Sequence, residues 1–141
     1  MNASIEMELM VAAALRGMQP PMGVPVVEGR AKTTRPPTYI AVNAIEEEYL
    51  INQLLKVTVE ILHVSQVDDS TTEAARAALQ RIYGFFSDDN SVLSAIREAG
   101  TPQMSSWPHF VYFAKGEHKK KDRSQGESIT MVFGVENQDV V

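Results

Sequence analysis

The most regular pattern of apolar and polar positions lies in the middle of the chain. From Leu55 to Ile61 every second side chain is apolar, and Lys56, Thr58 and Glu60 stand between them. Successive side chains of a strand point to opposite faces of a sheet. The alternation therefore predicts a strand with one buried face.

A helix is predicted directly after this strand. Ser70 and Glu73 have the spacing of a capping box, in which the serine caps the first turn and the glutamate reaches back to it. Behind them the apolar residues recur at helical spacing: Ala75, Ala78, Leu79, Ile82 and Phe86. This stripe needs a surface to cover, and the apolar face of the preceding strand is the nearest one. We therefore expect the strand and the helix over 71–86 to form the core.

The first helix is predicted over residues 4–16 and is apolar on two sides. One stripe consists of Ile5, Leu9, Ala12 and Ala13, and the other of Met7, Val11, Ala14, Leu15 and Met18. A helix of this kind is typically buried, here within the fold or between subunits. Glu6 and Glu8 lie near its positive N-terminal end, and Gly17 is predicted to end it.

The next part of the chain predicts a loop and a hairpin. Proline and glycine are frequent over 19–37, so regular structure there should be short. Residues 24–27 form an edge strand at most, because a proline within a strand is tolerated only at an edge. A strand is expected over 38–45, and the glutamates at 46–48 are expected to form a solvated turn. This strand and the alternating one should pair as an antiparallel hairpin.

The second half of the chain predicts a short helix and two further strands. The helix covers 91–99, and the strands cover 107–114 and 127–135, with a basic loop over 116–126 between them. The order of elements is then α-β-β-α-α-β-β. This order predicts a single α+β domain over 1–141, with an N-terminal helix, a largely antiparallel sheet of about four to five strands and a helix pair packed on one face.

Composition narrows the class of function. The chain has 141 residues, 44% hydrophobic and 22% charged, which is ordinary for a globular protein. Its net charge of −5 is unlike that of a general nucleic-acid-binding domain, which carries a basic face. The absence of cysteine excludes disulfides, thiolate metal sites and a cysteine nucleophile. No segment approaches the roughly 20 apolar residues of a membrane span, and the acidic first helix is unlike a signal peptide. We therefore expect no membrane partner.

The chain shows no motif for catalysis or for a cofactor. A Gly-x-Ser-x-Gly elbow and a glycine-rich phosphate loop are both absent. His63 and His109 would form a metal site only if their strands were neighbours and a carboxylate such as Asp68 joined them. Alternatively both are ordinary strand residues, since no two ligands share a metal-binding spacing. We therefore predict no catalytic, cofactor-binding or metal-binding residue.

Two basic segments are the candidate sites of partner contact. The first contains Arg30, Lys32 and Arg35, and the second contains Lys119, Lys120, Lys121 and Arg123. The second segment lacks the interleaved aromatic residues on which single-stranded nucleic acid stacks. It is either a solvated loop or an arm that orders against an acidic partner or a phosphate.

The order of elements resembles the tail terminator, or tail-completion, proteins of long-tailed bacteriophages. Members typically have a short helix, a proline-containing loop and strand, a long strand that leads through a polar turn into a helix, and late strands around a hairpin. The corresponding segments here are 7–15, 36–42, 56–64, 70–86, 107–114 and 127–135. The resemblance rests on lengths and hydrophobicity over nearly the whole chain. The family's Gly-Arg-Ile-Tyr-like start to the first sheet strand is matched only by Gly29-Arg30-Ala31.

This resemblance implies a structural role in the virion tail or neck and no enzyme activity or cofactor. Such proteins form a ring, usually hexameric, at the head-proximal end of the tail tube, stop tail growth and join the tail to the head. The implied partners are further copies of the chain, the tail tube protein and the head–tail connector or stopper protein. DNA would pass through the ring without specific binding, and a net-acidic ring suits such a channel because basic residues on its wall would bind phosphates. The protein would be made in the host cytoplasm.

Other interpretations of the same sequence stay open. One is a different phage neck, connector or minor tail protein. Another is a small cytosolic α+β enzyme or ligand-binding dimer with a pocket near His63, His109 and Trp107. A third is a monomeric adaptor that binds one protein through the aromatic strand over 107–114. The mass of the protein in solution separates an assembling protein from the last of these.

Overall fold

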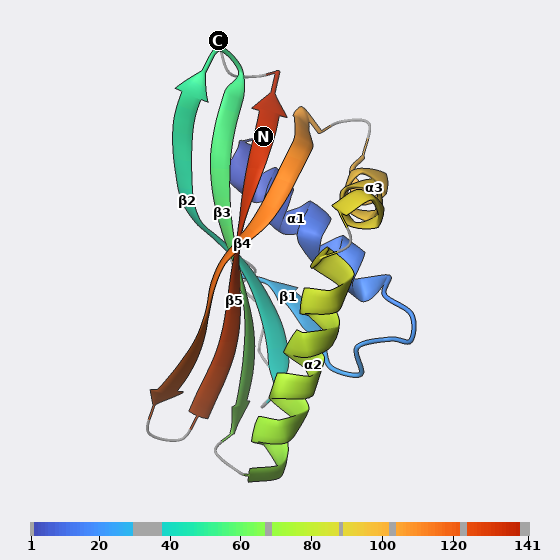
Figure 1. The fold of residues 1–141 in the computed structure, drawn as a ribbon, viewed down its shortest axis with the longest axis vertical. Helices are drawn as coiled ribbons and strands as arrows, with labels where there is room; N and C mark the ends of the chain where they lie inside the picture. The colour runs from blue at the N-terminus through green and yellow to red at the C-terminus, as the bar shows by residue number, and fades with distance from the viewer. Residues whose placement is uncertain are drawn as a thin grey trace.

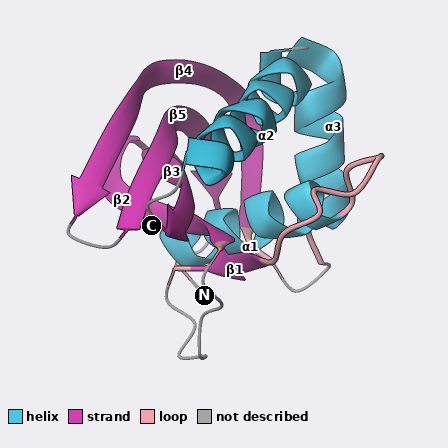
Figure 2. Cartoon of the chain, turned by 90° about the horizontal axis from the view of Figure 1, so that it is seen from below, coloured by secondary structure: helices cyan, strands magenta, loops and turns pink. Residues whose placement is uncertain are grey.

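The computed structural model describes residues 2–29, 38–66, 69–87, 89–101, 104–121 and 124–138. Within these residues, three helices lie on one side of a five-stranded sheet (Figures 1 and 2). In chain order the elements are α1 (Ala3–Arg16), β1 (Val26–Glu28), β2 (Tyr39–Ile51), β3 (Leu54–Gln66), α2 (Asp69–Ser87), α3 (Asp89–Ala99), β4 (Ser106–Lys121) and β5 (Ser124–Asn137). The predicted α+β class is confirmed.

The sheet has the strand order β1-β2-β3-β5-β4. Only the short edge strand β1 runs parallel to its neighbour, and all the other pairings are antiparallel. The two predicted hairpins, β2–β3 and β4–β5, are both present. The alternating strand β3 lies at the centre of the sheet, where its side chains meet neighbours on both sides.

The helix-covered face of the sheet holds the core. The apolar residues that alternate along β3 are all buried: Leu55, Val57, Val59 and Ile61. Their neighbours on β5 are buried on the same face: Ile129, Met131, Phe133 and Val135. From α2, the buried residues Leu79, Ile82 and Phe86 join the same cluster, so the predicted helical stripe covers the predicted strand face.

Helix α1 is buried on most of its sides, as its two apolar stripes predicted. Met7, Val11 and Leu15 are fully buried and belong to the core. The carboxylate of the buried Glu8 accepts a hydrogen bond at 3.0 Å from the backbone N–H of Ala44 on β2. The helix is therefore held between the sheet and α3 within one chain, and its burial requires no second subunit.

Two predicted turns are strands in the structure. The glutamates at 46–48 lie inside β2, and the hairpin turn lies at residues 52–53 instead, where Asn52 has a left-handed φ of 54°. The prediction of a basic loop over 116–126 is also wrong for the described residues. There β4 continues to Lys121, which pairs with Ser124 of β5.

Both errors have the same cause. A charged stretch has no apolar face, and in a sequence this pattern indicates a loop. At the edge of a sheet, however, charged side chains remain in water while the backbone pairs with its neighbour. Of the proline- and glycine-rich segment predicted as a loop, residues 19–29 are described and contain only β1, and residues 30–37 lie outside the described part of the chain.

Candidate functional site

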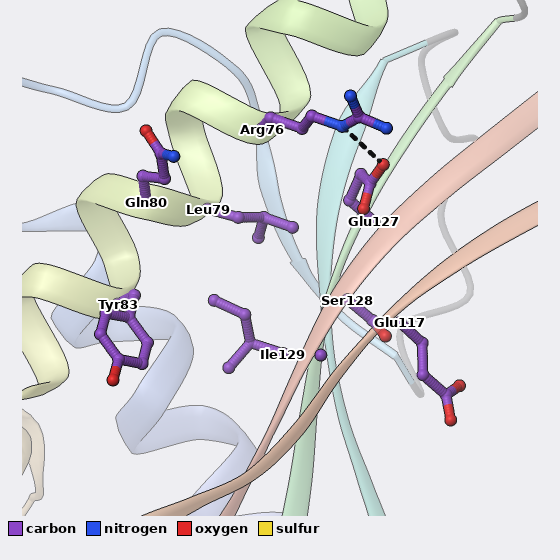
Figure 3. A pocket seen from close by; sticks show the side chains of 9 residues that line it. Arg76, Leu79, Gln80, Tyr83, Glu117, Glu127, Ser128 and Ile129 are labelled. Carbon is purple, nitrogen blue, oxygen red and sulfur yellow. Dashed lines mark hydrogen bonds and ion pairs between the residues drawn. The ribbon is translucent and has the colours of Figure 1, made fainter.

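A groove of about 530 Å³ lies between α2 and the β4–β5 hairpin (Figure 3). Its lining residues are Arg76, Leu79, Gln80, Tyr83, Gly116, Glu117, Glu127, Ser128 and Ile129. At its mouth, Nε of Arg76 donates a hydrogen bond at 3.2 Å to Oε1 of Glu127. The helix contributes one wall and the two strands contribute the other, so the groove exists only because α2 packs across the sheet.

The groove combines apolar walls with few charges. Two carboxylates and one guanidinium line it, and Glu117 also forms an ion pair at 2.6 Å with Lys115. The hydroxyl of Ser128 is buried and has no hydrogen-bond partner among the described residues. The lining includes neither a histidine nor a lysine. This arrangement suits the binding of a partly apolar group rather than proton transfer.

The structure does not form the pocket that was predicted near His63, His109 and Trp107. On β5, the residue opposite His63 is Glu127, and the residue opposite Trp107 is Glu136. Glu127 and Glu136 are nine positions apart on β5, so His63 and Trp107 are separated by about 30 Å along the strands. His109 lies beside Trp107 on β4, so only these two are neighbours. The prediction failed because β5 lies between β3 and β4, and its register places His63 and Trp107 near opposite ends of the sheet.

The two histidines have different environments. His63 is buried beneath the helices, and its Nδ1 has no partner among the described residues. Burial lowers the pKa of His63, because its protonated form would lose hydration, and the carboxylate of Glu127 opposes this effect in part. His109 is exposed, and its Nε2 lies 2.9 Å from Oε2 of Glu136. Within the described part of the chain, no three metal-ligating side chains gather at one point.

The predicted contact residues fall at the margin of what is described. Lys119, Lys120 and Lys121 are the last residues of β4 and form a strand rather than a loop, and their side chains are not described. Arg30, Lys32, Arg35 and Arg123 lie outside the described residues.

A buried polar cluster at the start of α1 was missed by the sequence reasoning. Glu6 is fully buried and accepts hydrogen bonds from the backbone N–H of Ser105 at 2.9 Å and the hydroxyl of Ser106 at 2.8 Å. Nδ2 of Asn137 lies 3.4 Å from the same carboxylate and donates to the Ser106 hydroxyl at 2.8 Å. The only signal in the sequence was a glutamate inside a helix that is apolar on two sides. The cluster ties α1 to the start of β4 and the end of β5 and therefore has a structural role.

The exposed apolar side chains gather at the two edges of the sheet. Strand β4 has a neighbour on one side only, and β1 covers β2 only at residues 40–42. Seven of the eight large apolar residues that are exposed among the described ones belong to β2 or β4, namely Ile45, Tyr49, Leu50, Ile51, Trp107, Phe110 and Tyr112. These edges are therefore the surface on which a binding role is best argued.

On β4 the two aromatic residues of the open face form a small platform. The rings of Phe110 and Tyr112 are stacked, with centroids 6.5 Å apart and planes inclined by 10°. Phe110 lies so close over Gly134 that a Cβ at this glycine would stand 2.1 Å from the ring. Val111 and Phe113 point the other way and pack against the core. The aromatic run thus places side chains on both faces of the sheet.

Comparison with models of known protein families finds no match for this chain, and a search of curated proteins finds none either. No helix within the described residues is long and apolar enough to cross a membrane. The function is therefore argued from the fold, the groove and the sheet edges.

Proposed function

We propose that the protein is a structural component of a tailed-phage virion. In this proposal, copies of the chain form a ring at the head-proximal end of the tail tube, stop tail growth and provide the surface that joins the connector. The observed order of helices and strands agrees with the order on which the resemblance to tail terminator proteins rests. It supports the proposal at the level of the fold.

The observation that carries the proposal is the position of the exposed apolar residues at both edges of one sheet. Proteins that remain monomeric usually blunt their sheet edges, because a free edge pairs readily with another chain. Here the edges at β2 and β4 are both open, and they differ from each other. When two different surfaces of a protein bind each other, the contact is head-to-tail, and it forms a closed ring if the rotation from one copy to the next closes. A net charge of −5 also suits a ring through which DNA slides.

The proposal is tested by the mass of the purified protein, measured by light scattering, with negative-stain images of the same fraction. We expect ring-shaped particles of several subunits, either alone or on the ends of polymerised tail tube protein from the same virus. We also expect the protein to stop elongation of those tubes. A monomer that neither forms rings nor binds tube ends would contradict the proposal.

A second candidate function, binding of a small ligand, is favoured by the groove beside α2. The Arg76–Glu127 pair offers polar contacts next to the apolar walls. This function is tested by screening small compounds with NMR of the methyl groups of Leu79 and Ile129. We expect binders to shift these signals in the native chain but not in an Arg76→Ala variant, if the pair contributes to recognition.

A further inference from the structure

Strand β2 after residue 42 and strand β4 each have one side without a neighbouring strand, and parts of these two open edges lie at the same level along the strand direction. In the upper half of Figure 1, β2 and β4 are the outermost strands. Glu47 of β2 pairs with Val57 of β3, which pairs with Phe133 of β5, and Phe133 pairs with Val111 of β4. Glu47 and Val111 therefore lie at the same level on the two edge strands. A rotation about an axis along the strands therefore brings the free stretch of β2 beside that of β4 in the next copy, without a shift along the strands.

Each stretch is bounded by two irregularities in its ladder. On β2 the residues without a paired partner are Ile45 and Leu50, and on β4 they are His109 and Ala114. Because a bulge interrupts regular pairing, each edge has a regular segment between its two bulges, 46–49 on β2 and 110–113 on β4, and β4 has a further regular segment at 115–121. The two segments between bulges have the same length.

The beginning of β4 is closed to a partner strand. Pro108 lacks a backbone N–H, and its carbonyl already accepts a hydrogen bond at 2.9 Å from Nε of Arg97 on α3. The guanidinium of Arg97 also lies 4.7 Å from the centre of the Trp107 ring. The first position at which β4 can begin a regular ladder with another chain is therefore near Phe110.

The directions of the strands also fit. Three antiparallel pairings separate β2 from β4, so the two strands run in opposite directions. Rotation about an axis along the strands keeps these directions. The two edges therefore meet as antiparallel strands, which form slightly more stable ladders than parallel ones.

Charge disfavours contact between two β2 edges. Strand β2 contains three glutamates and no basic residue, whereas the residues of β4 at their level, 110–112, carry no charge. Contact between two β2 edges places glutamates against glutamates, which is unfavourable, whereas contact with β4 places them opposite uncharged residues. Charge thus favours contact between unlike edges over a two-fold contact through β2.

From these features we propose that copies of the chain join by antiparallel pairing of segment 46–49 of one copy with segment 110–113 of the next. The partner is a second copy of this chain. The exposed apolar residues beside these segments are covered in the contact. This inference rests on the proposed ring function and identifies its interface. In the register of equal heights, Glu46 of one copy lies opposite Tyr112 of the next, so the paired residues within the two segments are 46–48 and 110–112.

Disulfide cross-linking tests this inference directly, because the chain has no cysteine of its own. Glu46→Cys and Tyr112→Cys are made in separate chains, one of which carries a purification tag. The two are mixed in equal amounts under mild oxidation. We expect the mixed dimer as the main product, since opposite residues of antiparallel strands bring their Cβ atoms to about 5 Å, near disulfide geometry. The double variant should give a ladder of covalent oligomers that collapses with reductant.

The matched control is Tyr83→Cys mixed with Glu46→Cys. Tyr83 is also an exposed aromatic residue, but it lies on α2, and its ring packs 4.6 Å from that of Phe113 on the helix-covered face of β4 rather than along the backbone edge of the strand. We expect at least tenfold less mixed dimer from this pair. Circular dichroism of each variant verifies that it is folded before it is mixed.

The outcomes separate the interface from the ring. Rings in light scattering without a 46–112 cross-link would overturn this interface and leave the ring standing. Dimers that link like edges, 46 to 46 or 112 to 112, would overturn the head-to-tail arrangement. A 46–112 ladder without capping of tail tubes would support the interface and contradict the proposed function. A protein that neither cross-links nor forms rings would contradict both.

Discussion

The helix-covered face of the sheet and its two open edges differ in how they place apolar side chains: the covered face buries them, and the edges leave them exposed to water. On the covered face, Leu15 of α1 is fully buried, and even the carboxylate of Glu6 has its hydrogen-bond partners. At the edge, Leu50 of β2 is 42% exposed and Ile51 is 65% exposed. The stability of one subunit therefore comes from the covered face. The edges hold apolar surface that a single subunit leaves in water, and such surface favours contact with another chain.

The strongest test of this contrast compares the same substitution in both regions. Leu15→Ala removes fully buried methyl groups, and we expect the free energy of unfolding to fall by about 3 kcal/mol. Leu50→Ala should change it by about 1 kcal/mol or less, because the side chain is already 42% exposed. Denaturant unfolding of the dilute protein measures both. Equal losses in the two variants would refute the contrast.

A second test examines the buried carboxylate on the covered side. Glu6→Ala leaves the N–H of Ser105 and the hydroxyl of Ser106 without their acceptor, so we expect a loss of about 2 kcal/mol in the free energy of unfolding. Glu6→Gln keeps one acceptor oxygen and should lose less. The matched control is Glu48→Ala at the exposed edge, and a loss there as large as at Glu6 would contradict the assigned role.

A third test uses pH to distinguish buried from exposed histidine. The pKa of His63 lies below its usual 6.5 in the folded protein, so the unfolded chain takes up the proton first as the pH falls. Stability should therefore be fully present above pH 6.5 and decline as the pH drops through 6.5 toward the lower folded pKa. His63→Gln should reduce this slope in denaturant unfolding between pH 7.5 and pH 5. An unchanged slope would contradict the burial of a neutral imidazole.

The smallest expected effect lies at the rim of the covered face. Oδ1 of Asn2 accepts a hydrogen bond at 2.9 Å from the N–H of Ile5 and caps α1. Asn2→Ala should lower the free energy of unfolding by about 1 kcal/mol, and Asn2→Asp should keep most of it, because aspartate accepts the same bond. Amide exchange of the first helical turn gives an independent readout. Equal effects of the two substitutions would show that the cap contributes nothing.

Much of the covered face was predictable because its signals are local. The alternation through Val57 and Val59 predicted β3, and the helical spacing through Leu79 and Ile82 predicted α2. The edges were predicted less well. The lysines at 119–121 were assigned to a loop from their polarity alone, whereas a strand at an edge accepts them.

The candidate sites were the least predictable part. Arg76 and Glu127, which form the ion pair at the groove, are 51 residues apart, and no spacing along the chain connects them. Glu6 and Asn137 are 131 residues apart. Conversely, His63 and His109 share a residue type and a predicted strand environment, but the register of β5 keeps them apart.

The sequence alone was sufficient to predict the three helices, the central parts of strands β2 to β5 and the apolar faces of these elements, because periodicity acts between residues that are neighbours in the chain. Only the tertiary structure decided the strand order, the register and the partner of each buried polar group. These features depend on contacts between segments that are distant in the chain, and the pattern of apolar and polar residues does not indicate which distant segments meet. The two open edges at one height belong to this second class, since a shift of β5 by a few residues would have moved segment 110–113 away from the level of 46–49.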